Sequence, residues 1–128
     1  MGNLIVGYLM EIVYANNKTE HVCTDFSAAL RFFGGNKPLA VSLMARINAI
    51  ESADVIKDII LSPPFHFHKL IGGITNYFAI DVKTRRDKWR IILTPLNEDK
   101  EEYIPCNIDK ISSYVKIIEI KEVSAHYE

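Results

Sequence analysis

The spacing of the apolar residues changes at Pro63-Pro64, and this change limits the possible folds more than any other feature of the chain. Upstream of the prolines, apolar residues recur at helical intervals in the segments 25–33, 36–50 and 52–60. Downstream, β-rich stretches with strand-like patterns follow at 77–82, 89–94 and 115–123. Because proline disfavours a helical conformation in the residue before it, the pair ends the last helix. The sequence therefore predicts helices first and a sheet afterwards.

A further strand is predicted ahead of the helices, at residues 10–14, where Met-Glu-Ile-Val-Tyr alternates. Thr24 and Asn36 are expected to cap the helices that follow, and Gly34-Gly35 is expected to end the first of them. The resulting element order is β-α-α-β-β-β. This order is typical of an α+β fold with two N-terminal helices packed on a small, mainly antiparallel sheet.

Two polar segments stand outside this pattern. Residues 15–20 are expected to form a loop. The acidic segment 97–114 is expected to contain a short helix near 109–114, and its sequence indicates no role. Residues 10–128 are interpreted as a single domain, whereas residues 1–9 extend the first strand or derive from an upstream start site.

Composition excludes several classes of protein. A chain of 128 residues with 48% hydrophobic residues is long and apolar enough for one ordered core. The two cysteines, Cys23 and Cys106, fit neither a disulfide framework nor a metal knuckle, and are interpreted as reduced thiols. The apolar run 4–9 is too short to cross a membrane and lacks the flanks of a signal peptide. We therefore expect a cytoplasmic protein with no membrane partner.

Positive charge is concentrated in one predicted hairpin, although the net charge of the chain is −1. Five of the eight residues at 83–90 are Lys or Arg, and most charge runs of this kind are solvated loops. Arg90 differs because it follows Trp89 inside a predicted strand, where alternation puts the two side chains on opposite faces. If Trp89 packs beneath the helices, Arg90 projects from the open face of the sheet. There its planar guanidinium could bind a phosphate.

Histidines lie on either side of this hairpin in the sequence. His66 and His68 are two positions apart, so on an extended segment their side chains point the same way. Such a pair can bind zinc, but no suitably spaced third ligand stands nearby, so no metal or other cofactor is predicted. The plain alternative is two polar residues at the start of a strand. His126 and Tyr127 either fray or reach the face of Arg90, where they could exchange protons or stack on a base.

Four motifs occur in the order found in a known protein family: His68-x-Leu70-x-Gly72, the strands 77–82 and 89–92, and 115–120 followed by His126-Tyr127. Together with the first strand at 10–14, this pattern resembles the HigB-like branch of the RelE/ParE toxin superfamily over residues 10–128. The resemblance implies the toxin of a type II toxin–antitoxin system, an endoribonuclease that cleaves mRNA on the translating ribosome. It also implies a cognate antitoxin, commonly a HigA-like protein with a helix-turn-helix domain.

The reaction implied by the resemblance needs no metal. The ribose 2′-hydroxyl attacks the adjacent phosphate and leaves a 2′,3′-cyclic phosphate and a 5′-hydroxyl. By resemblance Arg90 acts at the scissile phosphate, His68 is a candidate proton carrier, and His126 or Tyr127 takes the C-terminal catalytic role. The residues implied to hold RNA backbone phosphates are Lys69, Arg85, Arg86 and Lys88.

Two departures from the family pattern leave other functions open. Ile71 stands where family members often carry lysine, and the chain is slightly acidic where many relatives are basic. One alternative is a ParE-like inhibitor that binds DNA gyrase without catalysis, although titrating His68 and His126 favour the nuclease. The other is a degenerate toxin retained as an antitoxin-binding partner.

Overall fold

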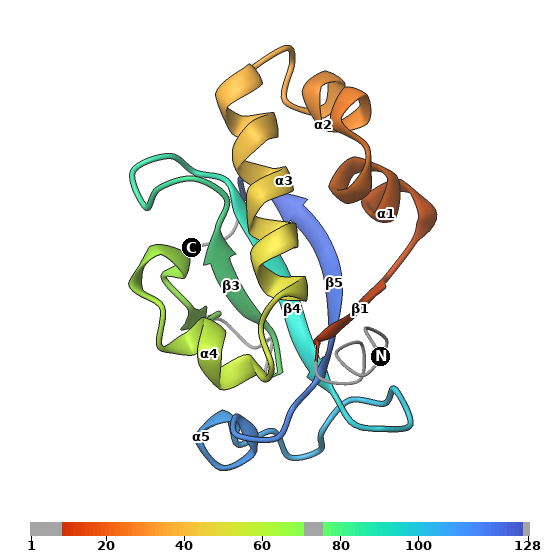
Figure 1. The fold of residues 1–128 in the computed structure, drawn as a ribbon, viewed down its shortest axis with the longest axis vertical. Coiled ribbons are helices and arrows are strands. Elements are labelled where there is room, and N and C mark those ends of the chain that lie inside the picture. The colour runs from red at the N-terminus through yellow and green to blue at the C-terminus, as the bar shows by residue number, and fades with distance from the viewer. Residues whose placement is uncertain (1–8, 71–75, 127–128) are drawn as a thin grey trace, which may run out of the picture.

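The computed structural model describes residues 9–70 and 76–126 and has an α+β architecture (Figure 1). Within these residues, five α-helices accompany one five-stranded mixed sheet. The helices and the single 3-10 turn are α1 (Asn17–Thr24), α2 (Phe26–Phe32), α3 (Lys37–Glu51), α4 (Ile56–Ile60), η2 (Pro63–Phe65) and α5 (Ile108–Ile111). The strands are β1 (Glu11–Tyr14), β2 (His68–Lys69), β3 (Phe78–Asp81), β4 (Arg90–Leu96) and β5 (Ile117–Ser124).

The strands lie in the order β1-β5-β4-β3-β2, so β4 is central and the last strand of the chain lies beside the first. β1 runs parallel to β5, and every other neighbouring pair is antiparallel. The predicted mainly antiparallel sheet is therefore confirmed. The pairing of β4 with β5 shifts by one residue between Ile92 and Leu93, which marks a β-bulge in the middle of the sheet.

The core lies between the sheet and the helices that cover one of its faces (Figure 1). From α3, Leu43, Ile47 and Ile50 join the same buried cluster as sheet residues such as Ile80 and Ile91. Each of these side chains stabilises the fold by about 1.5–3 kcal/mol through removal from water. A smaller cluster of Leu70, Ala79 and Ile92, with Tyr77 against it, lies apart from this core.

The helix caps explain where the first helices begin. Asn36 accepts the Leu39 N–H at 3.2 Å and starts α3, as predicted. The cap of α2 is Asp25, which accepts the Ala28 N–H at 2.8 Å, so the prediction of Thr24 was wrong by one residue. Thr24 is instead the last residue of α1.

The helical layer also contains more helices than predicted. Residues 17–24 form α1 where the sequence indicated a loop through residue 20, because Asn16 caps the segment by accepting the Thr19 N–H at 2.8 Å. α1 contains few apolar residues, so the apolar spacing of the sequence did not predict a helix there. The segment 52–60 is helical only as α4, and the short helix expected near 109–114 is α5.

Glycine permits the turn between α2 and α3. Gly34 and Gly35 have φ angles of 65° and 88°, in the left-handed region that glycine tolerates best. Their N–H groups bond to the carbonyls of Arg31 and Leu30, which closes the C-terminus of α2 as predicted. In the described part of the chain, no helix has the length and apolar character needed to span a membrane.

The burial of α3 generates a test of the core. Leu43 is fully buried whereas Val41, two residues earlier, is 49% exposed. Leu43→Ala is expected to lower the free energy of unfolding by about 2–5 kcal/mol, because it leaves a cavity against the sheet. Urea denaturation checks this, with Val41→Ala as the matched control on the same helix. Equal losses in the two variants would contradict the assigned face of α3.

The thiol of Cys23 generates a pH-dependence. Burial raises the pKa of Cys23 from 9.0 to about 12. Between these values the unfolded chain loses the thiol proton while the folded protein keeps it. The free energy of unfolding should therefore fall as the pH rises above about 9.

Denaturation midpoints measured from pH 7 to 10.5 check this expectation. Cys23→Ala should show a shallower fall than the wild type, whatever its stability at neutral pH. Cys106→Ala is the comparison: burial raises the pKa of Cys106 as well, but this thiol is less buried, so its removal should flatten the fall less than Cys23→Ala does. A fall that is equally steep in Cys23→Ala would show that other groups cause it.

Candidate functional site

Polar residues gather on one sheet face, at the end where the hairpin joins β3 to β4. The register places Asp81 opposite Arg90 and Arg90 opposite Ser124, so these three residues share a face. Their neighbours Ile80 and Ile91 belong to the core beneath the helices. The polar residues therefore lie on the face that the helical core does not use.

At the centre of this site is a buried carboxylate. The side chain of Asp81 is 3% exposed, and its Oδ1 lies 3.3 Å from Arg90 Nε and 3.0 Å from His66 Nδ1. An unpaired carboxylate at this depth would be strongly destabilising, so these two partners are what allow it to be buried. Asp81 thus joins β3, β4 and the segment before β2.

Arg90 does not project into solvent as the sequence suggested. Its side chain is 10% exposed, and its Nη1 donates to the carbonyls of Asp87 at 2.8 Å and Trp89 at 2.9 Å. Its Nη2 donates to the carbonyl of Arg85 at 3.2 Å. The expectation of an open guanidinium was wrong because the hairpin main chain turns its carbonyls toward it. The arginine fork therefore binds the hairpin itself.

The neighbouring tryptophan lies where alternation put it. Trp89 packs edge-on against Phe32 and Phe33 of the α2 region, with ring centroids 5.3 and 5.0 Å away. It is thus on the helical side of the sheet, whereas Arg90 and Asp81 are on the other. The predicted division of Trp89 and Arg90 between the faces is confirmed, although the exposure of Arg90 is not.

His66 has an unusual backbone conformation that brings the two histidines together. Its φ and ψ of 50° and 52° are left-handed, so the segment is not extended at this point as the spacing suggested. The rings of His66 and His68 nevertheless lie together, with centroids 4.6 Å apart and planes at 33°. His68 Nδ1 lies 2.7 Å from the His66 carbonyl. A carbonyl only accepts, so this nitrogen carries the proton.

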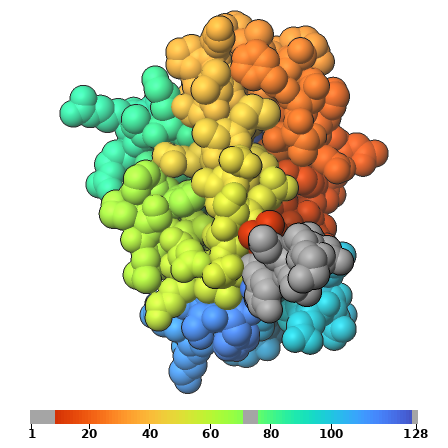
Figure 2. All heavy atoms as spheres, in the orientation of Figure 1, coloured from red at the N-terminus to blue at the C-terminus, as the bar shows by residue number. Residues whose placement is uncertain are grey.

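The hairpin between β3 and β4 presents the basic residues. Exposed cations on it are Lys83, Arg85, Arg86 and Lys88. The Asp87 carboxylate accepts the N–H groups of Thr84 and Trp89, each at 3.0 Å, and so holds the turn from within. Figure 2 shows this segment, in blue-green, projecting from one side of the molecule. The predicted RNA-binding residues Arg85, Arg86 and Lys88 thus share one solvent-exposed element.

The other predicted site residues lie on β2 and beyond the end of β5. His68 pairs with Ala79, which places it on the face of Asp81. Lys69 is exposed and pairs with Phe78, so it points to the opposite face. His126 is exposed and lies two residues beyond Ser124, whose Oγ accepts the His126 N–H at 3.0 Å. Tyr127 and Ile71 lie outside the described residues.

Arg46 of α3 makes a second set of hydrogen bonds near Asp81, which the sequence did not indicate. Its Nε donates to the Asp81 carbonyl at 2.9 Å, and its Nη2 donates to the carbonyls of Pro64 at 2.8 Å and Lys83 at 3.2 Å. Burial lowers the pKa of Arg46, and nearby Asp81 opposes this change. The side chain therefore ties α3 to η2 and to the base of the hairpin.

His66, Asp81 and Arg46 were not predicted from the sequence as members of the site. One signal was available for Asp81: it is a carboxylate in the apolar stretch 77–82, where burial demands a charged partner. Nothing in the sequence pairs Arg46 with the hairpin, because the two are far apart along the chain.

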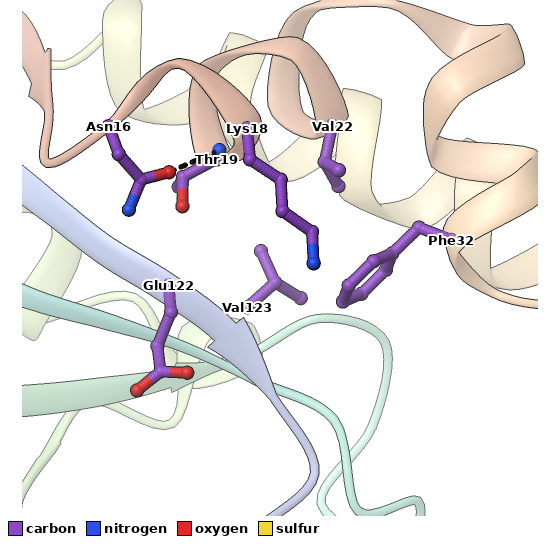
Figure 3. A pocket seen from close by; sticks show the side chains of 7 residues that line it. All are labelled: Asn16, Lys18, Thr19, Val22, Phe32, Glu122 and Val123. Carbon is purple, nitrogen blue, oxygen red and sulfur yellow. Dashed lines mark hydrogen bonds between the residues drawn. The ribbon is translucent and has the colours of Figure 1, made fainter.

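A separate hollow opens between α1, α2 and the end of β5, and has a volume of about 280 Å³ (Figure 3). It is lined by Asn16, Lys18, Thr19, Val22, Phe32, Glu122 and Val123. No residue of the Asp81 cluster lines it. Among residues 9–70 and 76–126, no group of three or more His, Cys, Asp or Glu side chains is arranged to hold a metal ion.

The chain was compared with known protein families, with curated proteins and with solved structures, and none matched. Its function must therefore be argued from its own residues.

The buried ion pair generates a stability test. Arg90→Met is expected to lower the free energy of unfolding by roughly 3–5 kcal/mol, because it leaves the buried Asp81 carboxylate without its cation. Urea denaturation at neutral pH checks this. Arg86→Met, on the exposed part of the same hairpin, is the control and should change stability little. An unchanged free energy of unfolding in Arg90→Met would contradict the stabilising role of the Arg90–Asp81 ion pair.

Proposed function

We propose that this protein is a HigB-like toxin of the RelE/ParE superfamily, an endoribonuclease that cleaves mRNA on the ribosome without a metal. The observation that carries the proposal is the gathering of separate motifs at one end of one sheet face. His68 and Arg90 lie on that face, and His126 follows Ser124, which pairs with Arg90. The exposed basic hairpin projects beside them.

The architecture supports the same proposal. One strand, β1, precedes the helical layer and the other strands follow it, which agrees with the expected α+β class, while β2, α1, α4 and α5 are additional to the expected β-α-α-β-β-β order. Helices cover one face of the sheet, and polar groups occupy the far end of the other.

The residues supply what transesterification of RNA needs. A group must take the 2′-hydroxyl proton, another must protonate the leaving oxygen, and positive charge must lie near the phosphate. His68 and His126 are the proposed proton carriers, with Tyr127 as an alternative at the C-terminus. Arg90 contributes positive charge and holds the hairpin, since most of its donors already have partners.

The exposed hairpin is proposed to bind the RNA backbone. Arg85, Arg86 and Lys88 extend from a turn that internal hydrogen bonds hold, so little backbone conformational entropy is lost when they meet phosphates. Lys69 would extend the same contact around the edge of the sheet at β2. Such contacts position RNA without reading its sequence.

The proposed setting is a bacterial cytoplasm with a cognate antitoxin encoded nearby. The antitoxin is expected to be a HigA-like protein with a helix-turn-helix domain, which would bind the toxin and hold it inactive. Expression without that partner should slow growth.

The direct test uses purified protein, translating ribosomes and a defined mRNA, in the Mg²⁺ buffer that intact ribosomes require. The wild type should cut the mRNA and leave 2′,3′-cyclic phosphate and 5′-hydroxyl ends. His126→Asn should slow cutting by about 10²-fold or more if it carries a proton in the reaction. Intact mRNA with the wild type, both on ribosomes and free in solution, would sink the proposal.

The hairpin has its own test. The triple variant Arg85→Ala, Arg86→Ala, Lys88→Ala should weaken RNA binding by at least about tenfold at low salt, and the loss should shrink as salt rises. The matched control removes three cations of the helical layer: Lys18→Ala, Arg31→Ala, Lys37→Ala. Equal weakening by both triples would indicate unspecific attraction to the whole protein.

A second candidate is a non-catalytic relative, either a gyrase inhibitor or a degenerate toxin retained to bind an antitoxin. The engagement of Arg90 with main-chain carbonyls favours it, because that guanidinium offers little to a scissile phosphate. Growth inhibition that a resistant gyrase relieves would support the inhibitor. Binding of a neighbouring gene product, with no toxicity from the free chain, would support the degenerate toxin.

A further inference from the structure

We infer that His66, oriented by Asp81, is the group that accepts the proton of the RNA 2′-hydroxyl, and that His68 beside it donates a proton to the leaving oxygen. This assignment rests on the proposed function, and it gives the role of proton acceptor to His66 in place of His126. It adds to the site a histidine–carboxylate pair that neither the sequence motifs nor the family resemblance indicated.

The hydrogen bond determines which nitrogen of His66 can react. Nδ1 of His66 lies 3.0 Å from Asp81 Oδ1, and an ionised carboxylate only accepts, so Nδ1 carries the proton. In the neutral ring Nε2 then holds the lone pair that can accept a proton. The His66 side chain is 31% exposed while the carboxylate behind it is 3% exposed. This is the arrangement of a base supported by a buried acid.

The carboxylate oxygen that contacts the His66 ring also contacts Arg90. Asp81 of β3 stabilises the imidazolium that forms when Nε2 is protonated. Arg90 of β4 shares the same carboxylate oxygen and offsets part of that attraction. The ring of His68, from β2, lies against that of His66 with the two planes tilted by 33°, and Arg46 of α3 donates to the main-chain carbonyl of Asp81.

The backbone gives independent support. His66 is one of two non-glycine residues with positive φ in the described segments, and left-handed backbone is disfavoured for side chains with a Cβ. Its N–H bonds to the Pro63 carbonyl at 3.0 Å, and its carbonyl accepts from His68. Conformations of this kind persist where surrounding contacts over-determine them, and they cluster at active sites.

The 2′-hydroxyl proton passes to His66 Nε2 as the 2′ oxygen forms a bond to phosphorus. The bond from phosphorus to the 5′ oxygen breaks, and that oxygen takes a proton from the imidazolium of His68. The products are a 2′,3′-cyclic phosphate and a 5′-hydroxyl. Proton exchange with solvent then returns His66 to the neutral form and His68 to the protonated form.

His66→Asn is the sharpest variant. An Asn amide can still donate to Asp81, and Asn tolerates left-handed backbone better than most residues, but it has no proton-accepting nitrogen. We expect kcat to fall about 10²–10⁴-fold, with KM for the ribosome-bound mRNA and the thermal midpoint little changed. His21→Asn, an exposed histidine on α1, is the control and should keep wild-type kcat.

The pH profile separates the two histidines. The wild type should show a bell-shaped kcat, His66→Asn should lose the acidic limb, and His68→Asn should lose the alkaline limb. Asp81→Asn should also lower kcat about 10²–10⁴-fold by favouring the wrong tautomer of His66. Nitrogen-15 NMR of the imidazoles should show a protonated Nδ1 on His66 in the wild type and its loss in Asp81→Asn.

The outcomes distinguish this inference from the proposed function. Cutting by the wild type together with normal kcat in His66→Asn would overturn the assignment of His66 and leave the nuclease standing. An unprotonated Nδ1 on His66 by NMR would overturn the pairing with Asp81. No cutting by the wild type would overturn the proposed function, and the role of His66 in it, at once.

Discussion

The buried carboxylate of Asp81 is the constraint on which the hairpin end of the sheet depends. An ion taken out of water costs several kcal/mol unless charged partners and hydrogen bonds surround it. Arg90 and His66 both contact one oxygen of Asp81, and Arg46 contacts its main chain. Each partner comes from a different element. The free-energy cost of burying the Asp81 carboxylate is therefore offset only when β4, α3 and the segment before β2 are all folded.

The same constraint explains the hairpin. Arg90 lies between the Asp81 carboxylate and the carbonyls of Arg85, Asp87 and Trp89, so the charge that stabilises Asp81 also closes the turn. The other cations of the hairpin, Lys83, Arg85, Arg86 and Lys88, are exposed to solvent. Internal hydrogen bonding thereby produces an ordered, positively charged projection, which is the property a phosphate-binding element requires.

Much of the fold could be predicted from the sequence. Alternation located β3, β4 and β5 to within about two residues, and Asn36 marked the start of α3, because these features depend on neighbours in the chain. α1 was missed because its apolar content is low and a local cap starts it. Of the site, the sequence indicated His68, the basic hairpin and the opposite placement of Trp89 and Arg90.

What the sequence by itself determined is therefore the α+β class, the faces of the strands and the presence of a basic turn, since all three follow from local patterns in the chain. Only the tertiary structure determined which groups Arg90 contacts and that His66 pairs with Asp81. Residue spacing cannot show which carbonyls and carboxylates surround a side chain, because those groups come from segments that meet only on folding. That is why Arg90, which was expected to bind a ligand, binds its own hairpin. It is also why Asp81, which the sequence placed in a strand, was not predicted to hydrogen-bond to His66.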